Sequence, residues 1–394
     1  MQSLARPHPP HTGILILAVA SANLGLSLLS PVITQLRDDL MATADEAQLV
    51  LGSFMLSVAL SQLVAGSLSD KFGRRYVLII GAVVFGVGGV GAMLAPNIEM
   101  LIGLRILQGI GAAACMTMGR VIVNDSFDGA EAARKMSVVS SAQAIVPLLG
   151  FGFGGVIAEF IGWRGSIGIM VLGALSIGVL SSLYVTETRR GAPVPLRLAS
   201  LSAAYLSLIR TPAVRYHGLT SGFAIGMFFA MGGTMPYEFD RLGVSPMEFG
   251  LLFAMTSIGY VSGNAVNRAL VGRVGLSRMA FFGSLLTLLV PGSMLVGHVF
   301  ELLSPTVLSF LCFCFGVCNG LVIANSMICS MRAAGENSGA GTGLLGAIQM
   351  LLGALSGSVI IGLGGAEDFA VTAGGLLLMA MMGATASFLG SKVR

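Results

Sequence analysis

Charged residues are scarce in this chain. Asp, Glu, Lys and Arg make up 10% of its 394 residues, whereas hydrophobic residues make up 55%. A soluble domain carries about 25% charged residues, so the composition argues against a soluble protein. A helix that crosses a bilayer needs about 20 successive apolar residues, and several uncharged runs reach that length. These runs are too long, and too rich in Gly and Ala, for membrane β-barrel strands of about 10 alternating residues. The sequence therefore predicts a membrane protein with several spanning helices.

Several chemical motifs are missing as well. The sequence has no Walker-type phosphate loop, no nucleophile with a neighbouring base and no soluble domain. We therefore expect neither an ATP-driven pump nor an enzyme, and we expect no cofactor, no metal and no nucleic-acid partner. All five cysteines lie in apolar surroundings, where they act as small apolar fillers. They are Cys115, Cys312, Cys314, Cys318 and Cys329.

Twelve apolar runs are long enough to cross the membrane as helices. The longest polar interruption, 187–213, separates six of them from the other six, and a short interfacial helix is expected within it, near Leu198 to Leu208. We predict an all-α membrane protein with twelve transmembrane helices in two pseudo-symmetric six-helix bundles. The bundles cover 1–186 and 214–394. The runs cover about 13–35, 47–68, 76–96, 99–123, 136–160, 164–186, 214–237, 248–270, 278–298, 303–327, 339–363 and 369–390.

The distribution of Lys and Arg predicts the orientation. Short cytoplasmic loops carry an excess of these residues. If the N-terminus is cytoplasmic, most of the 22 basic residues fall on the cytoplasmic side and most of the acidic residues fall outside. We therefore expect both termini in the cytoplasm, and a location in the cytoplasmic (inner) membrane of a bacterium.

One loop occurs in both halves. The stretch "LSDKFGRR", from Leu68, joins the second and third runs, and "LVGRVGLSR", from Leu270, joins the eighth and ninth. Gly73 in the first loop corresponds to Gly275 in the second. Duplicated six-helix units are a known transporter architecture, with the substrate site at the midplane between the halves.

Five motifs carry a resemblance to a known family. "GSLSDKFGRR" from Gly66 and "LIGLRILQGIGAAA" from Leu101 resemble signatures of the major facilitator superfamily. "MGRVIVND" from Met118 resembles the drug:proton antiporter branch. "GVSPMEFGLLFA" from Gly243 and "AGTGLLGAIQMLLGA" from Ala340 are similar to the Bcr/CflA drug-resistance subfamily. The resemblance implies the fold of that superfamily and a secondary active transporter.

The resemblance also implies a conformational switch at the first loop. Asp70 would pair with Arg120 and face the start of the eleventh helix, near Gly339 to Gly341, whose positive dipole end favours an anion. These contacts would hold the cytoplasmic side shut in the outward-facing state. The residues that we assign to the switch are Gly66, Asp70, Gly73, Arg74, Arg75 and Arg120.

Arg105 is the most distinctive single residue. It lies about 9 Å inside the fourth run, and charges at such depth usually face a cavity. A side chain that extends outward to the interface is the alternative. The resemblance implies a role for Arg105, with Gln108 and Gly109, in proton coupling or in contact with a substrate anion.

The sequence departs from the family pattern in the first helix. Many relatives carry an acid there, at the position that Ser27 occupies. No Asp or Glu lies in the middle of any run, and Glu238 is the nearest carboxylate. Proton coupling is therefore implied by the resemblance without an obvious carrier.

Polar and soft side chains within the runs predict the substrate cavity. Met227 and Met231 share one face of the seventh run and suit a site for several apolar ligands, with ordinary packing as the alternative. With Arg105 as a cation and no anion, the cavity suits neutral or anionic amphiphiles. The predicted cavity residues are Asn23, Ser27, Gln143, Met227, Met231, Asn319, Asn325 and Gln349.

Two functions follow as hypotheses. The first is an exporter of small amphipathic compounds, drug-like or metabolic, that works by proton-coupled alternating access. The second is a facilitative or uptake carrier for a metabolite or organic anion, which the missing acid of the first helix favours. The expected partners are a small-molecule substrate, protons and the lipid bilayer, and the chain is expected to act as a monomer.

Overall fold

The chain folds into helices alone over the residues that a computed structural model describes, which are 10–127, 129–189, 198–335 and 338–393. The helices are α1 (Thr12–Ser27), η1 (Ser30–Val32), α2 (Ile33–Asp39), α3 (Ala44–Phe72), α4 (Arg74–Met93), α5 (Ile98–Ser126), α6 (Gly129–Ile161), α7 (Trp163–Tyr184), α8 (Leu198–Arg210), α9 (Pro212–Arg241), α10 (Pro246–Val274), α11 (Leu276–Val299), α12 (Pro305–Ala334), α13 (Ser338–Ile360), η3 (Ile361–Gly365) and α14 (Phe369–Lys392).

Eleven helices in the described residues are long and apolar enough to cross a membrane. The first comprises α1, η1 and α2 together. α6 corresponds to the remaining predicted run, and its described apolar stretch, Ile145–Ile161, is shorter than the others. The predicted all-α membrane fold is confirmed, and the predicted short helix is present as α8.

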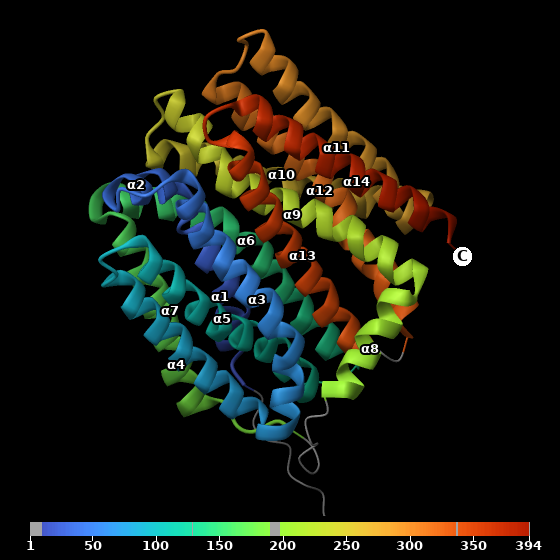
Figure 1. Cartoon of the computed structure of the whole chain (residues 1–394). Helices are drawn as coiled ribbons and strands as arrows, with labels where there is room; N and C mark the ends of the chain where they lie inside the picture. The colour runs from blue at the N-terminus through green and yellow to red at the C-terminus, as the bar shows by residue number, and fades with distance from the viewer. Residues whose placement is uncertain (1–9, 128, 190–197, 336–337, 394) are drawn as a thin grey trace, which may run out of the picture.

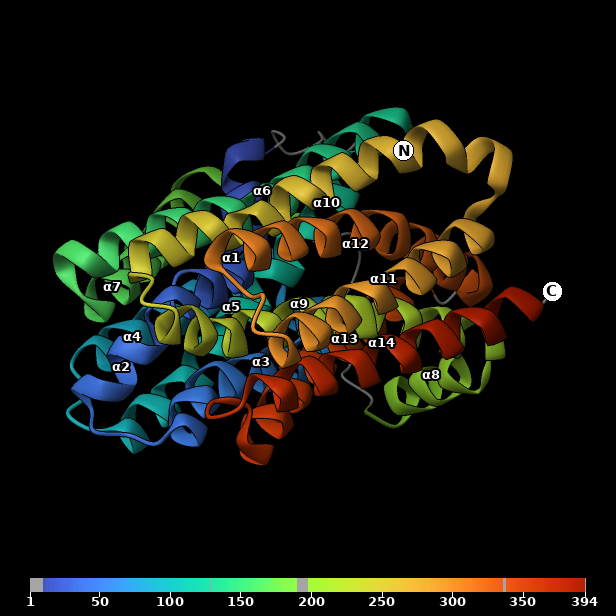
Figure 2. The same cartoon turned by 90° about the horizontal axis from the view of Figure 1, so that it is seen from above.

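The two bundles repeat the same packing. In the first bundle α5 packs against α1, α3 and α4, while α7 packs against α4. In the second bundle α12 packs against α9, α10 and α11, while α14 packs against α11. Between the bundles the main contacts are α3 with α13 and α6 with α10, which are equivalent pairs. Figure 1 shows the second bundle, in yellow to red, beside the blue to green first bundle, and Figure 2 shows the same arrangement turned by 90°.

α3 and α10 begin and end in the same way. Thr43 and Ser245 form capping boxes with the glutamate three residues later, which satisfies backbone N–H groups in the first turn. Each helix ends at one glycine, Gly73 with φ 103° and Gly275 with φ 89°. This backbone conformation favours glycine, and the next helix starts one residue later. The repeated loop in the sequence is thus a repeated one-residue connection.

The ends of the bundles differ, and we name them by the helices found there. The α2 end holds α2 and the start of α7. The α8 end holds Asp70, Gly73 and the start of α13, and α8 packs there against α9 and α13. On α8, Tyr205 and Leu208 belong to a small apolar cluster with Leu344 of α13. α8 therefore packs against the second bundle.

Candidate functional site

A cavity of about 350 Å³ lies between the two bundles. Its walls come from α1, α3, α5 and α6 on one side and from α9, α10, α12 and α13 on the other. Aromatic, amide and thioether side chains dominate the lining. They include Asn23, Gln62, Met116, Phe228, Phe229, Tyr260, Asn319, Met327, Gln349 and Met350. We call this the central cavity.

A second cavity of about 390 Å³ adjoins the central cavity toward the α8 end. Gln62 and Arg120 line both cavities. The second cavity is lined by Asp70 from the first bundle, Tyr205 from α8 and Thr342 from α13. The space between the bundles therefore extends from the middle of the molecule toward the α8 end.

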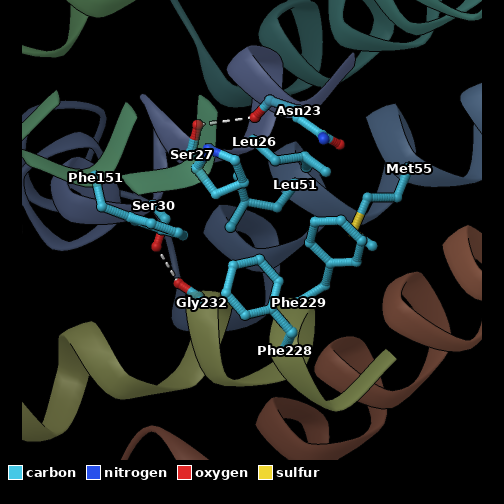
Figure 3. A pocket seen from close by; sticks show the side chains of 11 residues that line it. Asn23, Leu26, Ser27, Ser30, Leu51, Met55, Phe151, Phe228, Phe229 and Gly232 are labelled. Atoms are coloured by element: carbon cyan, nitrogen blue, oxygen red, sulfur yellow. Dashed lines mark hydrogen bonds between the residues drawn. The ribbon is translucent and has the colours of Figure 1, made fainter. Parts of the chain in front are cut away.

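Toward the α2 end only a small pocket of about 20 Å³ remains between the bundles. Figure 3 shows this small pocket, where Phe228 and Phe229 approach Leu51 and Met55. The hydroxyl of Ser30 donates a hydrogen bond to the Gly232 carbonyl, which joins the two bundles directly. These contacts close the molecule at the α2 end.

Glycines make a second close contact between the bundles at the α2 end. A Cβ on Gly250 of α10 would overlap the carbonyl oxygen of Phe151 in α6, and a Cβ on Gly155 would overlap the carbonyl of Pro246. Only a residue without Cβ lets two helix backbones approach so closely. Gly155 thus packs between the bundles, whereas the neighbouring Gly154 packs against the backbone of Leu28 within the first bundle.

Four of the predicted cavity residues lie where the cavities are. Asn23, Asn319 and Gln349 line the central cavity from α1, α12 and α13. Ser27 lines the small pocket, and its hydroxyl donates to the Asn23 carbonyl at 2.8 Å. Asn319 donates from Nδ2 to the Ala224 carbonyl at 3.2 Å. In the described chain its buried Oδ1 has no hydrogen-bond partner.

Other predicted cavity residues lie elsewhere. Met227 and Met231 are each 1% exposed in the apolar core of the second bundle, and neither lines the three cavities described above. Asn325 instead donates to Asn267 at 2.7 Å. The side chain of Gln143 lies outside the described residues. Met227 and Met231 lie on the face of α9 that packs into the core of the second bundle. Phe228 and Phe229 lie on the adjacent face, which lines the central cavity.

Arg105 is wholly buried inside the first bundle and lines none of these cavities. Its guanidinium donates to the Gly25 carbonyl at 2.6 Å and to the Val50 carbonyl at 3.3 Å. It also donates to Gln108 Oε1 at 2.5 Å. Among the described residues no carboxylate lies within ion-pair distance of it. The side chain therefore ties α5 to α1 and α3 through backbone carbonyls.

The break after α1 explains why the Gly25 carbonyl is available. In a continuous helix the N–H of Leu29 would donate to it. Here the N–H of Leu29 donates to the Leu26 carbonyl instead, because the chain tightens into η1 before Pro31. A buried carbonyl needs a partner, and the Arg105 guanidinium supplies it.

Gln108 and Gly109 complete the same contact region. Gln108 is fully buried and accepts the hydrogen bond from Arg105. A Cβ on Gly109 would overlap the Ser57 hydroxyl and the Phe54 carbonyl, so Gly109 permits the close crossing of α5 and α3. The structure brings together the three residues that we assigned to coupling, at the centre of the first bundle.

Asp70 forms its ion pair with Arg74, at 2.6 Å, whereas the resemblance implied Arg120 as partner. Arg74 also pairs with Asp125 at 3.0 Å. Arg120 of α5 lines both large cavities. The turn at Gly73 places Arg74 beside Asp70 in the described conformation, and the contact of Asp70 with Arg120 in the outward-facing state stays a prediction.

The segment after α7 holds this loop at both of its helix ends. The carboxylate of Glu187 accepts from the backbone N–H of Arg74 at 2.9 Å and of Arg75 at 3.3 Å. The Arg189 guanidinium donates to the Lys71 carbonyl at 2.7 Å. An anion thus sits at the start of α4 and a cation at the end of α3, as the helix dipoles favour. Sequence reasoning missed both residues, although a charged pair directly after a span was a visible signal.

Gly66 and Arg75 also lie at this loop. Gly66 lines the second cavity and has nothing within 4 Å of a Cβ built on it. Arg75 donates to the Ser182 carbonyl at 2.7 Å, which joins the start of α4 to the end of α7. All switch residues except Arg120 thus cluster around the one-residue turn.

Curated relatives resemble the chain over most of its length. An uncharacterized transporter of the same superfamily type, YdgK from Bacillus subtilis, is 28% identical over 93% of this chain and 91% of its own. A bicyclomycin resistance protein homolog from Haemophilus influenzae is 24% identical over 85% of each chain. A chloramphenicol resistance protein from Pseudomonas aeruginosa is 32% identical over 61% of this chain and 57% of its own. These relatives confirm the resemblance to the drug-resistance branch.

Solved structures share the fold. A D-xylose-proton symporter superposes with a TM-score of 0.74, at 15% identity, over 97% of both chains. The model of the Major Facilitator Superfamily matches residues 15–357. This chain therefore belongs to the Major Facilitator Superfamily, and it is a multi-pass membrane transporter and not an enzyme.

Proposed function

We propose that this protein exports small amphipathic compounds from a bacterial cell by proton-coupled alternating access, as a monomer in the inner membrane. One observation carries the proposal: a cavity of about 350 Å³ between the bundles adjoins a second cavity toward the α8 end, while the α2 end is closed. A transporter that alternates between two such states exposes one site to each side of the membrane in turn.

The α8 end faces the cytoplasm in this proposal. It carries basic residues in short segments, among them Lys71, Arg75 and Arg189, and cytoplasmic loops are enriched in such residues. Both termini then lie in the cytoplasm. The described conformation is the inward-facing one, ready to take a compound from inside the cell.

Export as the direction is supported by the relatives. Two of them are named for resistance to chloramphenicol and bicyclomycin, and resistance follows when a compound is removed from the cell. The mixed lining of amides, aromatic rings and thioethers suits ligands with both polar and apolar parts.

Rocking of the two bundles is supported by their symmetry. The equivalent contacts α3 with α13 and α6 with α10 can remain as pivots while the two ends exchange roles. The loop around Gly73, with Asp70, Arg74 and Glu187, is placed where the α8 end would have to close. We assign the switching role to this cluster.

Facilitative transport is the second candidate, because one observation favours it. No carboxylate lines the central cavity among the described residues, so a proton carrier beside the substrate is lacking there. For the first candidate, the proton-coupled exporter, we retain Arg105, Gln108 and Gly109 as the proposed coupling group.

Efflux from cells that lack their main drug pumps tests the proposal. Accumulation of neutral, anionic and cationic aromatic compounds is compared with and without a protonophore, in cells with and without the protein. Lower accumulation that the protonophore abolishes supports proton-driven export. Higher uptake, or movement that the protonophore leaves unchanged, supports the facilitative carrier instead.

A further inference from the structure

Among the described residues, Arg120 has the one formally charged side chain that lines the central cavity. The other polar lining groups are amides, hydroxyls and a phenol, such as Asn23, Gln349 and Tyr260. A ligand in this cavity therefore meets a guanidinium among uncharged polar and apolar groups.

The two ends of the central cavity differ in chemistry. Phe228 and Phe229 lie at the closed end, because they also line the small pocket toward the α2 end. Arg120 lies at the open end, because it also lines the second cavity toward the α8 end. An elongated ligand therefore has an aromatic wall at one end and a guanidinium at the other.

The wall of the central cavity also contains a hydrogen-bond acceptor, that of Asn319. Asn319 uses its Nδ2 on the Ala224 carbonyl, and its Oδ1 has no partner in the described chain. A buried acceptor without a partner is costly, and a rotation of the Asn319 side chain that exposes Oδ1 to the cavity would let a ligand N–H or O–H group satisfy it. This acceptor suits ligands with a donor group and gives no preference for negative charge.

We propose that the central cavity selects compounds by charge, that it takes aromatic anions first and uncharged aromatic amides or alcohols second, and that it discriminates against cations. The aromatic ring packs on Phe228 and Phe229, and the anionic or acceptor group points to Arg120. The inference rests on the proposed function for its biological meaning, because it names the substrate class of the same cavity.

The order of affinity follows from how an anionic and a cationic ligand each interact with the Arg120 guanidinium. A carboxylate that reaches Arg120 gains a charge-assisted hydrogen bond, which is about twice as strong as a neutral one. An ammonium group in the same place is repelled by the guanidinium, and the described lining of the central cavity holds no carboxylate that could bind the ammonium group. The aromatic contact is the same for both ligands, so the charge decides the order of affinity.

Three probes with one ring and different charge test the inference. They are naphthalene-2-carboxylate, naphthalene-2-carboxamide and naphthalen-2-ylmethylammonium. Binding of each to the purified full chain is measured by equilibrium dialysis, for the parent, Arg120→Gln and Arg120→Lys. The matched control is Arg268→Gln, which removes an exposed arginine from α10.

The expected result is an affinity for the carboxylate at least about tenfold above that for the ammonium. Arg120→Gln should lower carboxylate affinity about tenfold and leave carboxamide affinity within about twofold, while Arg120→Lys retains the order. Equal affinities in the parent, or a loss in Arg120→Gln that is the same for all three probes, would overturn the inference. The second result would mean that Arg120 only maintains the structure.

Uptake into inside-out vesicles with an imposed proton gradient separates the two proposals. Accumulation of the preferred probe in the expected order supports both. Accumulation that favours the cation overturns the charge selection and leaves export standing. Binding in the expected order without gradient-driven accumulation supports the charge selection and contradicts proton-driven export.

Discussion

The guanidinium of Arg105 lies 4.0 Å over the ring of Phe54, and both side chains are fully buried. A cation over an aromatic face is stabilised by the ring quadrupole. The same guanidinium donates to carbonyls of α1 and α3. Arg105 is thus a structural centre of the first bundle, whatever its part in coupling.

Replacement of Arg105 by Ala should lower the stability of the first bundle. Two backbone carbonyls and Gln108 would lose their donor, and each buried group left unsatisfied costs about 1–3 kcal/mol. We expect a loss of about 3 kcal/mol or more, visible as a lower thermal midpoint. Trp163, the only tryptophan in the chain, reports on this bundle by fluorescence. Arg268→Gln is the control, and an unchanged midpoint in Arg105→Ala would contradict a structural role.

Replacement of Glu187 by Ala should loosen the start of α4. The N–H groups of Arg74 and Arg75 would lose their acceptor, and loss of such a cap costs about 1–2 kcal/mol. Hydrogen exchange at these amides should become faster. Glu159→Ala, which removes an exposed carboxylate from α6, should leave their exchange unchanged. Equal exchange in both variants would mean that the carboxylate does not hold the loop.

Replacement of Gly250 by Ala should prevent closure at the α2 end. The new methyl group would meet the Phe151 carbonyl, which belongs to a helix backbone and cannot turn away. A cysteine at Ser30, buried in the closed end, should then react faster with an impermeant maleimide, and export should fall. Gly374→Ala is the matched control because its Cβ has nothing within 4 Å. Slow labelling in Gly250→Ala would show that the helices tolerate the methyl group.

Replacement of Tyr205 by Phe should disfavour the described conformation. The Tyr205 hydroxyl donates to the Leu63 carbonyl of α3 at 2.7 Å, while its ring packs near α13. Burial raises the pKa of Tyr205 above its usual value, so the hydroxyl remains a donor at physiological pH. We expect a shift of about 1 kcal/mol toward closure of the α8 end, measured by maleimide labelling of a cysteine at Thr342. The control is Ser207→Ala, which alters an exposed hydroxyl of α8. If Tyr205→Phe and Ser207→Ala show similar labelling rates, the contact of Tyr205 with Leu63 does not stabilise the described conformation.

Hydrophobic runs and their breaks predicted the helices well, because a bilayer requires long apolar segments with internal hydrogen bonds. Asn319 and Gln349, two of the polar residues assigned to the substrate cavity, line the central cavity, since amides within a span avoid lipid, and their contact with a substrate stays a prediction. The orientation of α9 about its axis was harder to predict. Met227 and Phe228 are both apolar, and only packing against α13 and α14 decides which of them faces the cavity.

The charged groups show a second limit of sequence reasoning. Arg105 was expected at a cavity because a buried charge needs polar partners. Its partners are backbone carbonyls, and Gly25, which supplies one of them, lies 80 residues earlier in the chain. Likewise the sequence did not show that Arg120 lines both large cavities, and its pairing with Asp70 in the outward-facing state stays a prediction. Side-chain type signalled the importance of both residues, and tertiary contacts decided their surroundings.

The one-residue connection at Gly73 has a mechanical consequence. α3 ends at Phe72 and α4 begins at Arg74, so the ends of the two helices cannot separate by more than about 7 Å, the reach of two successive Cα–Cα steps. α3 faces the second bundle, whereas α4 exposes Ile80, Val83 and Val87 on its outer surface. A tilt of α3 that changes the cavity must therefore carry a lipid-facing helix with it. The two states would then present different outlines to the bilayer, so the thickness and lateral pressure of the membrane enter their balance.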